Sequence, residues 1–320
     1  MVRELEELET LLAAAETLQE IQSRRKAIAR FAVEDLAKTG PGSSVFEGRY
    51  ADSPAILKLF HGPERTERAR AQKRELTRLG AFMATGRFRV APLLNAWPGE
   101  GITVTARIEG TPMDAMLADA PPTDRDALLG GAGQWLAHLV SRATRQHSFG
   151  GRYWVRVRTA DLSDITDGPD GALAAALAQR LAQRLPAVAG ATVTQARCHS
   201  DFAPANLIVT PAALYGVDIQ NANWLPLVKD LARFLVYLET RHPRSRAERP
   251  LGIAQPDIDA LCAPLQRYFT PIDRSRLLPF FIGVELADKF ATIDRAAPRA
   301  DNLRRAITAY LRAPTTALPG

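Results

Sequence analysis

The sequence predicts an α+β protein in which a small, sheet-rich N-terminal part precedes a larger, mainly helical part. From about residue 31 to 108, short β-like segments such as VFEGRY and AILKLF alternate with turn sequences such as ADSP. Beyond Gly110 most segments carry apolar residues at helical spacing, and only LIVTPAALYGVDI is β-like. With 320 residues and 46% hydrophobic composition, the chain can bury a sizeable core.

The first element is a helix over residues 3 to 30. Leu5, Leu8, Leu12 and Ala15 recur at helical spacing, the first half is acidic, and the basic run SRRKAIAR stands in the last turns. The apolar repeat fades after Ala15. We therefore expect this helix to pack on the following domain rather than to form a dimeric coiled coil.

The elements that follow divide the chain into two lobes. In the N-terminal lobe, residues 1–108, ADSP joins VFEGRY to AILKLF, PGE joins VAPLLNAW to GITVTARI, and residues 63–85 form one helix. The C-terminal helical lobe, residues 109–320, contains helical patterns such as DRDALLGGAGQWLAHLVSRA, GALAAALAQRLAQRL, LVKDLARFLVYLE and FFIGVELADKF.

Composition excludes several classes of protein. Cys198 and Cys262 are the two cysteines, which argues against a disulfide framework and a thiolate zinc site. The N-terminus lacks the basic leader and apolar core of a secretory signal, and no apolar run could span a bilayer. The net charge of +6 comes without a patterned basic helix or an aromatic RNA-binding motif. We expect a cytoplasmic protein that neither inserts in a membrane nor binds nucleic acid.

The stretch CHSDFAPANLIV carries the candidate chemistry, because it places His199, Asp201 and Asn206 in the spacing H-x-D-x-x-x-x-N before a β-like run. If LIVTPAALYGVDI forms a hairpin centred on Ala212, Asn206 lies opposite Asp218. Asp201, Asn206 and Asp218 would then offer the oxygen ligands that Mg²⁺ prefers. A capping Asp and a turn Asn beside a hairpin are the ordinary alternative.

A second set of polar residues lies in the N-terminal lobe. Lys58 interrupts the apolar strand AILKLF, and Glu75 interrupts an apolar helical stripe, so each charge calls for a partner or for solvent. Upstream, TGPGSSVFEGRY places glycines and serines just before a strand. Backbone amides of such a loop can cradle phosphate oxygens, although the same residues are ordinary turn formers. The candidates in this loop are Gly40, Gly42, Ser43 and Ser44.

These motifs, in this order, resemble the protein-kinase-like superfamily. The run HSDFAPANLIV…LYGVDIQNA…KDLARFL is most similar to the aminoglycoside phosphotransferase and choline kinase branch of small-molecule kinases, whose motif reads H-G-D-x-x-x-x-N. The resemblance covers roughly residues 35 to 300 and is specific from about residue 196 to 238. It implies the bilobal protein-kinase-like fold, with a small antiparallel-sheet N-lobe and a larger helical C-lobe.

The resemblance also implies a role for each matching residue. Asp201 would be the catalytic base for a hydroxyl of a small molecule, and Asn206 and Asp218 would bind Mg²⁺. The nucleotide, ATP or GTP, would be held by Lys58, Glu75, Gly42, Ser43 and Ser44, with Glu75 fixing Lys58. His199 would brace the loop, and Asp230 would accept hydrogen bonds from its backbone amides.

Departures from the kinase patterns keep two alternatives open. The Gly-rich loop lacks a third glycine, since Val45 stands where the pattern would continue, and this leaves room for a non-catalytic kinase-like binding or scaffold protein. Ser200 replaces the Arg of protein kinases, and nothing resembles A-P-E, so a protein kinase is disfavoured.

The segment GGRYWVRVRTADLSD suggests an acceptor site. If it is extended, alternation places Arg152, Trp154, Arg156 and Arg158 on one face. Such a face would suit an anionic or sugar-like acceptor through bidentate pairing or ring stacking, whereas a solvated strand face is the simpler interpretation. The basic segment argues against an aminoglycoside, because aminoglycosides are polycations.

Overall fold

The computed structural model describes residues 2–40, 42–219 and 223–314, and it divides into two compact units. The first unit comprises residues 1–110 and 208–222, and the second comprises residues 111–207 and 223–320. The hairpin that follows the H-x-D-x-x-x-x-N motif thus groups with the N-terminal residues, although about 100 residues separate them in the sequence. Within these described residues, no helix is long and apolar enough to cross a membrane.

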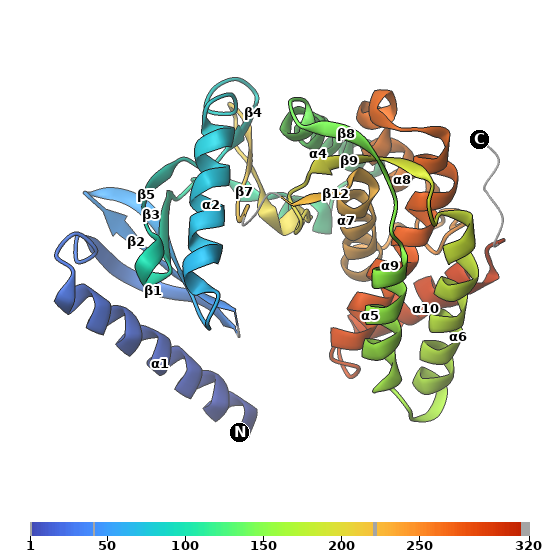
Figure 1. Cartoon of the computed structure of the whole chain (residues 1–320), viewed down its shortest axis with the longest axis horizontal. Coiled ribbons are helices and arrows are strands. Elements are labelled where there is room, and N and C mark those ends of the chain that lie inside the picture. Colours follow the sequence, from blue (N-terminus) through green and yellow to red (C-terminus); the bar gives the residue numbers. More distant parts are fainter. Residues whose placement is uncertain (1, 41, 220–222, 315–320) are drawn as a thin grey trace. The chain divides into compact units, whose positions relative to one another are not determined.

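A five-stranded antiparallel sheet forms the centre of the first unit, in the order β1-β2-β3-β6-β5 (Figure 1). The predicted ADSP turn joins β2 to β3, and its central residues Ala51 and Asp52 have φ of 50° and 65°. Two positive φ values in a two-residue loop match the twist of the strands on either side. The strands are β1 (Phe31–Gly40), β2 (Ser43–Tyr50), β3 (Ser53–Phe60), β5 (Leu93–Trp97) and β6 (Ile102–Ala106).

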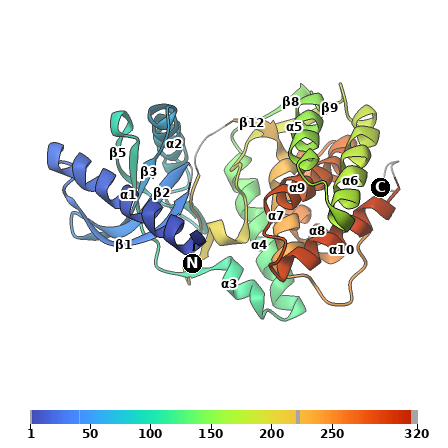
Figure 2. The same cartoon turned by 90° about the horizontal axis from the view of Figure 1, so that it is seen from below.

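The N-terminal helix α1 (Val2–Arg24) covers one face of this sheet (Figure 2). Its residues Ala14, Leu18 and Ile21 are buried in one core cluster with Phe46, Leu57 and Val104 of the strands. The prediction that this helix packs on the following domain is therefore confirmed, but the helix ends at Arg24 and not at residue 30, because residues 26–30 form the turns that lead into β1. Leu12 is 55% exposed, and the side chains of Leu5 and Leu8 lie outside the described residues.

The helix α2 (Arg65–Gly80) packs on β3, β5 and β6. Because side chains alternate along β3, Leu57 and Leu59 join the α1 core while Lys58 points to the opposite face. On α2, Gln72 accepts a hydrogen bond from Thr103, which pairs with Lys58 in the sheet, and donates one to the carbonyl of Ile219 at 3.0 Å. Gln72 thereby links the sheet to the segment that carries Asp218.

The hairpin after the H-x-D-x-x-x-x-N motif consists of β10 (Leu207–Val209) and β11 (Leu214–Gly216), and β11 pairs in parallel with β4 (Phe88–Val90). The turn closes between Thr210 and Ala213, where the Thr210 amide donates to the Ala213 carbonyl at 2.9 Å. This closure lies off the predicted centring on Ala212. The Thr210 hydroxyl, which accepts from the Ala213 amide, explains why the turn closes there.

The second unit is mainly helical, and α9 (Leu278–Thr292) forms its centre, packed against α5, α6, α7 and α10 (Figure 2). Its sequence LPFFIGVELADKF is apolar on nearly every side, as expected for a helix surrounded by others. The other helices are α3 (Met113–Ala118), α4 (Pro122–Val140), α5 (Arg152–Ser163), α6 (Gly168–Arg184), α7 (Leu227–Arg241), α8 (Gln255–Cys262) and α10 (Arg299–Arg312).

Short helical turns complete both units. They are the 3₁₀ segments η1 (Pro98–Glu100), η2 (Leu185–Ala187), η3 (Pro204–Asn206) and η4 (Ala263–Tyr268), and the π-helical segment η5 (Asp273–Leu277).

A three-stranded antiparallel sheet in the second unit was not predicted. Its order is β12-β9-β8, with β8 (Thr144–Ser148), β9 (Thr192–Arg197) and β12 (Trp224–Pro226), and the two-residue strand β7 is Thr111–Pro112. All five residues of β8, TRQHS, are exposed, so this edge strand has no apolar alternation. The hydrophobic pattern of the sequence therefore does not predict β8.

The expectation of an extended segment after Gly151 is wrong. Residues 152–163 form the helix α5, so Arg152, Trp154, Arg156 and Arg158 do not share a face. Helical spacing instead puts Trp154, Arg158 and Leu162 on the side that packs on α9, and it leaves Arg152 and Arg156 exposed. Three branched or aromatic residues, Trp154, Val155 and Val157, suggested a strand, but packing against α9 overrides this weak local preference.

Candidate active site

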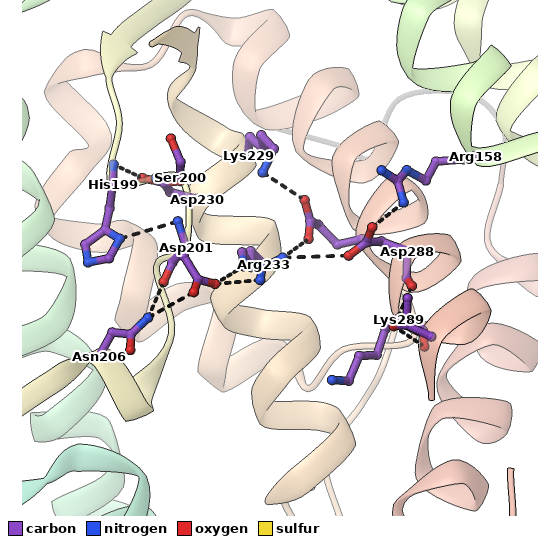
Figure 3. A network of polar contacts seen from close by, with 12 residues as sticks. Arg158, His199, Ser200, Asp201, Asn206, Lys229, Asp230, Arg233, Asp288 and Lys289 are labelled. Atoms are coloured by element: carbon purple, nitrogen blue, oxygen red, sulfur yellow. Dashed lines mark hydrogen bonds and ion pairs between the residues drawn. The ribbon is translucent and has the colours of Figure 1, made fainter. Parts of the chain in front are cut away.

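The loop between β9 and β10 carries His199, Ser200 and Asp201, and Asp230 anchors it from α7 (Figure 3). The Asp230 carboxylate is fully buried and accepts the backbone amides of His199 at 2.7 Å and Ser200 at 3.1 Å. This is the bonding that the resemblance implied for Asp230. Burial raises the pKa of Asp230, and nearby Lys229 opposes that shift.

The His199 ring braces the same loop. It is 1% exposed and lies edge-on to the buried Trp135, with ring centroids 5.9 Å apart. Its Nδ1 accepts the Asp201 amide at 3.4 Å. His199 is thus built into the core beneath the loop, where it orients the backbone of Asp201.

Ser200 adopts a backbone conformation that favours glycine, with φ of 71°. The family motif H-G-D has glycine at this position, so the structure explains the motif. A residue with a Cβ is held there because its amide is bonded to buried Asp230.

Arg233 and Asn206 hold the side chain of Asp201. The Arg233 Nε donates to Oδ1 of Asp201 at 2.7 Å, and the Nη2 to Oδ1 distance is 2.5 Å. The Asn206 amide nitrogen donates to the Asp201 carbonyl at 2.8 Å and to its Oδ2 at 3.3 Å. The structure therefore brings together the predicted pair Asp201 and Asn206.

The pKa of Asp201 lies below its usual value. Partial burial by itself raises the pKa, but the charge and the hydrogen bonds of Arg233 outweigh burial, with smaller contributions from His199 and Asn206. Arg233 responds in the opposite direction: burial lowers its pKa, and the carboxylates of Asp201 and Glu285 raise it overall. Asp201 is consequently ionised at neutral pH.

Arg233 connects Asp201 to a network on α9 (Figure 3). Its Nη1 lies 3.4 Å from buried Glu285 and 3.7 Å from Asp288. Glu285 also pairs with Lys229 at 3.3 Å, and Asp288 pairs with Arg158.

Sequence reasoning missed this network, although two signals pointed to it. Arg233 stands three positions after Asp230 and so shares its helical face, and Glu285 interrupts an otherwise apolar helix.

Lys58 and Asp218 form the corresponding pair in the first unit. The Lys58 ammonium, with an 8% exposed side chain, contacts Oδ1 of Asp218, whose side chain is 32% exposed. Asp218 has φ of 58°, again in the left-handed region. The Arg78 Nε donates a hydrogen bond to the carboxylate of buried Glu75 at 2.9 Å. The expected Lys58–Glu75 ion pair stays a prediction.

The Gly-rich segment forms the turn from β1 to β2, where Gly40 pairs with Ser43, and Pro41 lies outside the described residues. Arg68 of α2 donates to the Gly42 carbonyl at 2.7 Å. The Ser44 hydroxyl is fully buried and lies 2.8 Å from Nε2 of His61. Burial, followed by the charge of Arg68, lowers the pKa of His61. The turn is therefore tied to α2, and Ser44 is part of the interior.

The donor atoms fit a hard cation. Asn206 turns its amide nitrogen to Asp201, so its amide oxygen is the atom it could offer to a metal, and Asp218, in the other unit, carries a carboxylate. Among the described residues, no three His, Cys, Asp or Glu side chains gather as ligands for a metal. Both cysteines are buried thiols, and burial raises the pKa of each.

Comparisons with known proteins agree with this geometry. The model of the family described as "Phosphotransferase enzyme family" matches residues 39–261. A choline/ethanolamine kinase family protein from Mesorhizobium loti is similar in structure, with a TM-score of 0.60 and 17% identity, over 93% of this chain and 96% of that one. A comparison with curated protein sequences finds no match.

Two further solved structures carry ligands. A glucosamine kinase in complex with glucosamine, ADP and inorganic phosphate has a TM-score of 0.54 and 16% identity, over 92% of this chain and 81% of that one. A thermostable mutant of aminoglycoside phosphotransferase APH(4)-Ia, in a ternary complex with AMP-PNP and hygromycin B, has a TM-score of 0.55 and 15% identity, over 88% and 94%. These likenesses identify the protein-kinase-like fold of small-molecule kinases. The family model spans well over half of the chain, which therefore belongs to the phosphotransferase enzyme family.

Proposed function

We propose that this protein transfers the γ-phosphoryl group of ATP or GTP, with Mg²⁺, to a hydroxyl group of a small molecule. The observation that carries the proposal is the environment of Asp201: an ionised carboxylate on a loop anchored by buried Asp230 and held at its side chain by Arg233. A carboxylate fixed in this way can orient an acceptor hydroxyl and take its proton as the new P–O bond forms.

The nucleotide side of the proposal rests on the first unit. Lys58 would contact the α- and β-phosphates, which compete with Asp218 for its ammonium. The amides of the turn at Gly42, Ser43 and Ser44 would face the phosphates, and Arg68 fixes this turn through the Gly42 carbonyl. The ADP and AMP-PNP in the two ligand complexes support a nucleotide site in this fold.

Asn206 and Asp218 would hold the cation. A bound Mg²⁺ neutralises the charge on the phosphate oxygens and orients them. The contribution of this chain is to keep Asn206 in place through its bonds to Asp201, so that the loop carrying the base also carries a metal ligand.

Thermal unfolding with and without nucleotide tests the assignment. A nucleotide at 100 times its dissociation constant adds about 2.7 kcal/mol to the free energy of unfolding, which raises Tm by several degrees. The rise should require Mg²⁺ and should disappear in Asp218→Ala. Absence of a shift with both ATP and GTP, each at millimolar concentration with Mg²⁺, would contradict the proposal.

A further inference from the structure

A row of polar side chains leads away from Asp201 along α7. Arg233, Tyr237 and Arg241 follow one another at intervals of four residues and so lie on one face of the helix. Arg233 contacts Asp201 directly, and the Arg241 guanidinium lies over the Tyr237 ring, 5.0 Å from its centroid. At a rise of 1.5 Å per residue, Arg241 stands about 12 Å beyond Arg233 along the helix axis.

Lys289 of α9 lies beside this row (Figure 3), where its side chain extends from α9 toward α7. Burial lowers the pKa of Lys289, as do the charges of Arg299, Arg241 and Arg233, while Asp288 opposes them. Three guanidinium groups therefore act on one half-buried ammonium. In the part of the chain that the structure describes, no hydrogen bond or ion pair satisfies this ammonium.

Arg299, at the start of α10, adds a fourth cation to Arg233, Arg241 and Lys289. Asn302, three positions further along α10, donates to the Thr240 carbonyl at 2.9 Å, and this bond places the start of α10 beside the end of α7 that carries Arg241. The Nε of Arg299 is buried and has no hydrogen-bond partner within the described ranges. A buried donor without an acceptor is costly, and it is satisfied when a ligand supplies one.

The cations of α7, α9 and α10 at this place outnumber the carboxylates that pair with them. Arg233 is matched by Asp201, Glu285 and Asp288, and Arg241 is partly matched by Asp114 at 3.8 Å. Asp114 is shared with His242, whose Nε2 lies 2.7 Å from it. Within the described residues, no ion pair joins Lys289 or Arg299 to a carboxylate, and an anion would relieve the repulsion between these two cations.

We propose that Arg241, Lys289 and Arg299, here called the basic cluster, bind an anionic group of the acceptor, so that the substrate is a hydroxyl compound carrying a phosphate or carboxylate. This inference rests on the proposed function. Arg233 links the basic cluster to Asp201, so a molecule whose anion occupies the cluster presents its hydroxyl on the side of the catalytic base. A neutral sugar would leave the two unmatched cations as they are, and a polycation would be repelled.

Calorimetric titration of inorganic phosphate tests the basic cluster. The protein is first saturated with AMP-PNP and Mg²⁺, so that phosphate cannot occupy the nucleotide site, and sodium chloride keeps the ionic strength equal throughout. Lys289→Gln and Arg299→Gln should each weaken phosphate binding roughly tenfold or more, because each removes a charge-assisted hydrogen bond. Lys289→Arg, which keeps the charge, should retain most of the affinity.

Arg305→Gln is the matched control, because Arg305 lies on the exposed side of α10 and pairs with Asn302 of the same helix. It removes the same charge and should change phosphate affinity less than about twofold. Sodium acetate provides the second arm: tighter binding of acetate than phosphate, lost in the same variants, identifies the anionic group as a carboxylate.

The outcomes separate this inference from the proposed function. Equal phosphate affinity in wild type, Lys289→Gln and Arg299→Gln, with the AMP-PNP shift in Tm intact, overturns the basic cluster and leaves the kinase assignment standing. If AMP-PNP gives no shift while the two variants still lose phosphate binding, the nucleotide assignment fails and the anion site stands.

Discussion

Two cation–carboxylate pairs, one in each unit, hold the candidate catalytic groups in different ways. Lys58 of the first unit is an ammonium on a buried strand that meets Asp218, and its side chain is 8% exposed. Arg233 of the second unit is a guanidinium with a 33% exposed side chain that contacts carboxylates from both the loop and α9.

The difference follows from the chemistry of the two cations. An ammonium is a compact charge that can exchange one oxygen partner for another, which suits the proposed exchange of Asp218 for phosphates at Lys58. A guanidinium is a planar fork that fixes the orientation of its partner. We infer that the Lys58–Asp218 ion pair separates when nucleotide binds, whereas the Arg233–Asp201 ion pair stays intact.

The largest expected effect comes from removing the base. Asp201→Asn should lower kcat by about 10²- to 10⁴-fold, the usual contribution of a positioned proton acceptor. The nucleotide-induced rise in Tm should survive, because the phosphate contacts proposed for Lys58 belong to the first unit. Activity is measured with labelled ATP once an acceptor is known. A variant that retained most of the transfer would remove Asp201 from the mechanism.

The next effect tests the proposed rigidity of the Arg233 pair. Arg233→Gln should lower kcat by about tenfold to 10²-fold, because a misplaced base loses much of its advantage. Without Arg233, burial dominates and the pKa of Asp201 rises, so the acid limb of the pH–rate profile should move to higher pH. An unchanged acid limb in the pH profile of kcat would mean that Arg233 does not set the ionisation of Asp201. Arg305→Gln serves again as the control for loss of one charge.

A smaller effect, on stability, comes from the anchor beneath the loop. Asp230→Asn keeps the shape of the side chain but leaves one of the amides of His199 and Ser200 without a carboxylate oxygen. A buried unsatisfied donor costs about 1–3 kcal/mol, so Tm should fall by several degrees. If Tm were unchanged, the loop would be held by other contacts.

The smallest effect concerns the backbone of the same loop. Glycine adopts the positive φ of residue 200 without the steric cost of a Cβ, so Ser200→Gly should add up to about 1 kcal/mol to the free energy of unfolding. The greater conformational entropy of glycine in the unfolded chain reduces this gain. Ser200→Ala keeps a Cβ and should give no such gain. A loss of stability in the glycine variant would show that the Ser200 side chain makes a contact of greater value.

The sequence was sufficient for the parts of the site that local rules govern. Lys58 was found because a charge in an apolar strand is costly, and the Ala51–Asp52 turn followed from turn chemistry. Asp201 and Asn206 were found as a spaced motif, and η3, a single helical turn, brings them together.

Three features depended on packing and could not be read locally. The helix α5 has strand-forming residues at its start, and contact with α9 decides its conformation. Strand β8 has no buried side chain to mark it. The basic cluster joins residues from α7, α9 and α10, whose convergence depends on how these helices pack.

The position of α1 has a practical consequence for anyone who shortens this chain. The family model begins at residue 39, so a fragment that starts there would discard α1 and most of β1. The sheet face that contains Phe46, Leu57 and Val104 would then meet water. We expect such a fragment to be recovered as aggregated material, and its lack of activity would report the trimming rather than the chemistry of the enzyme.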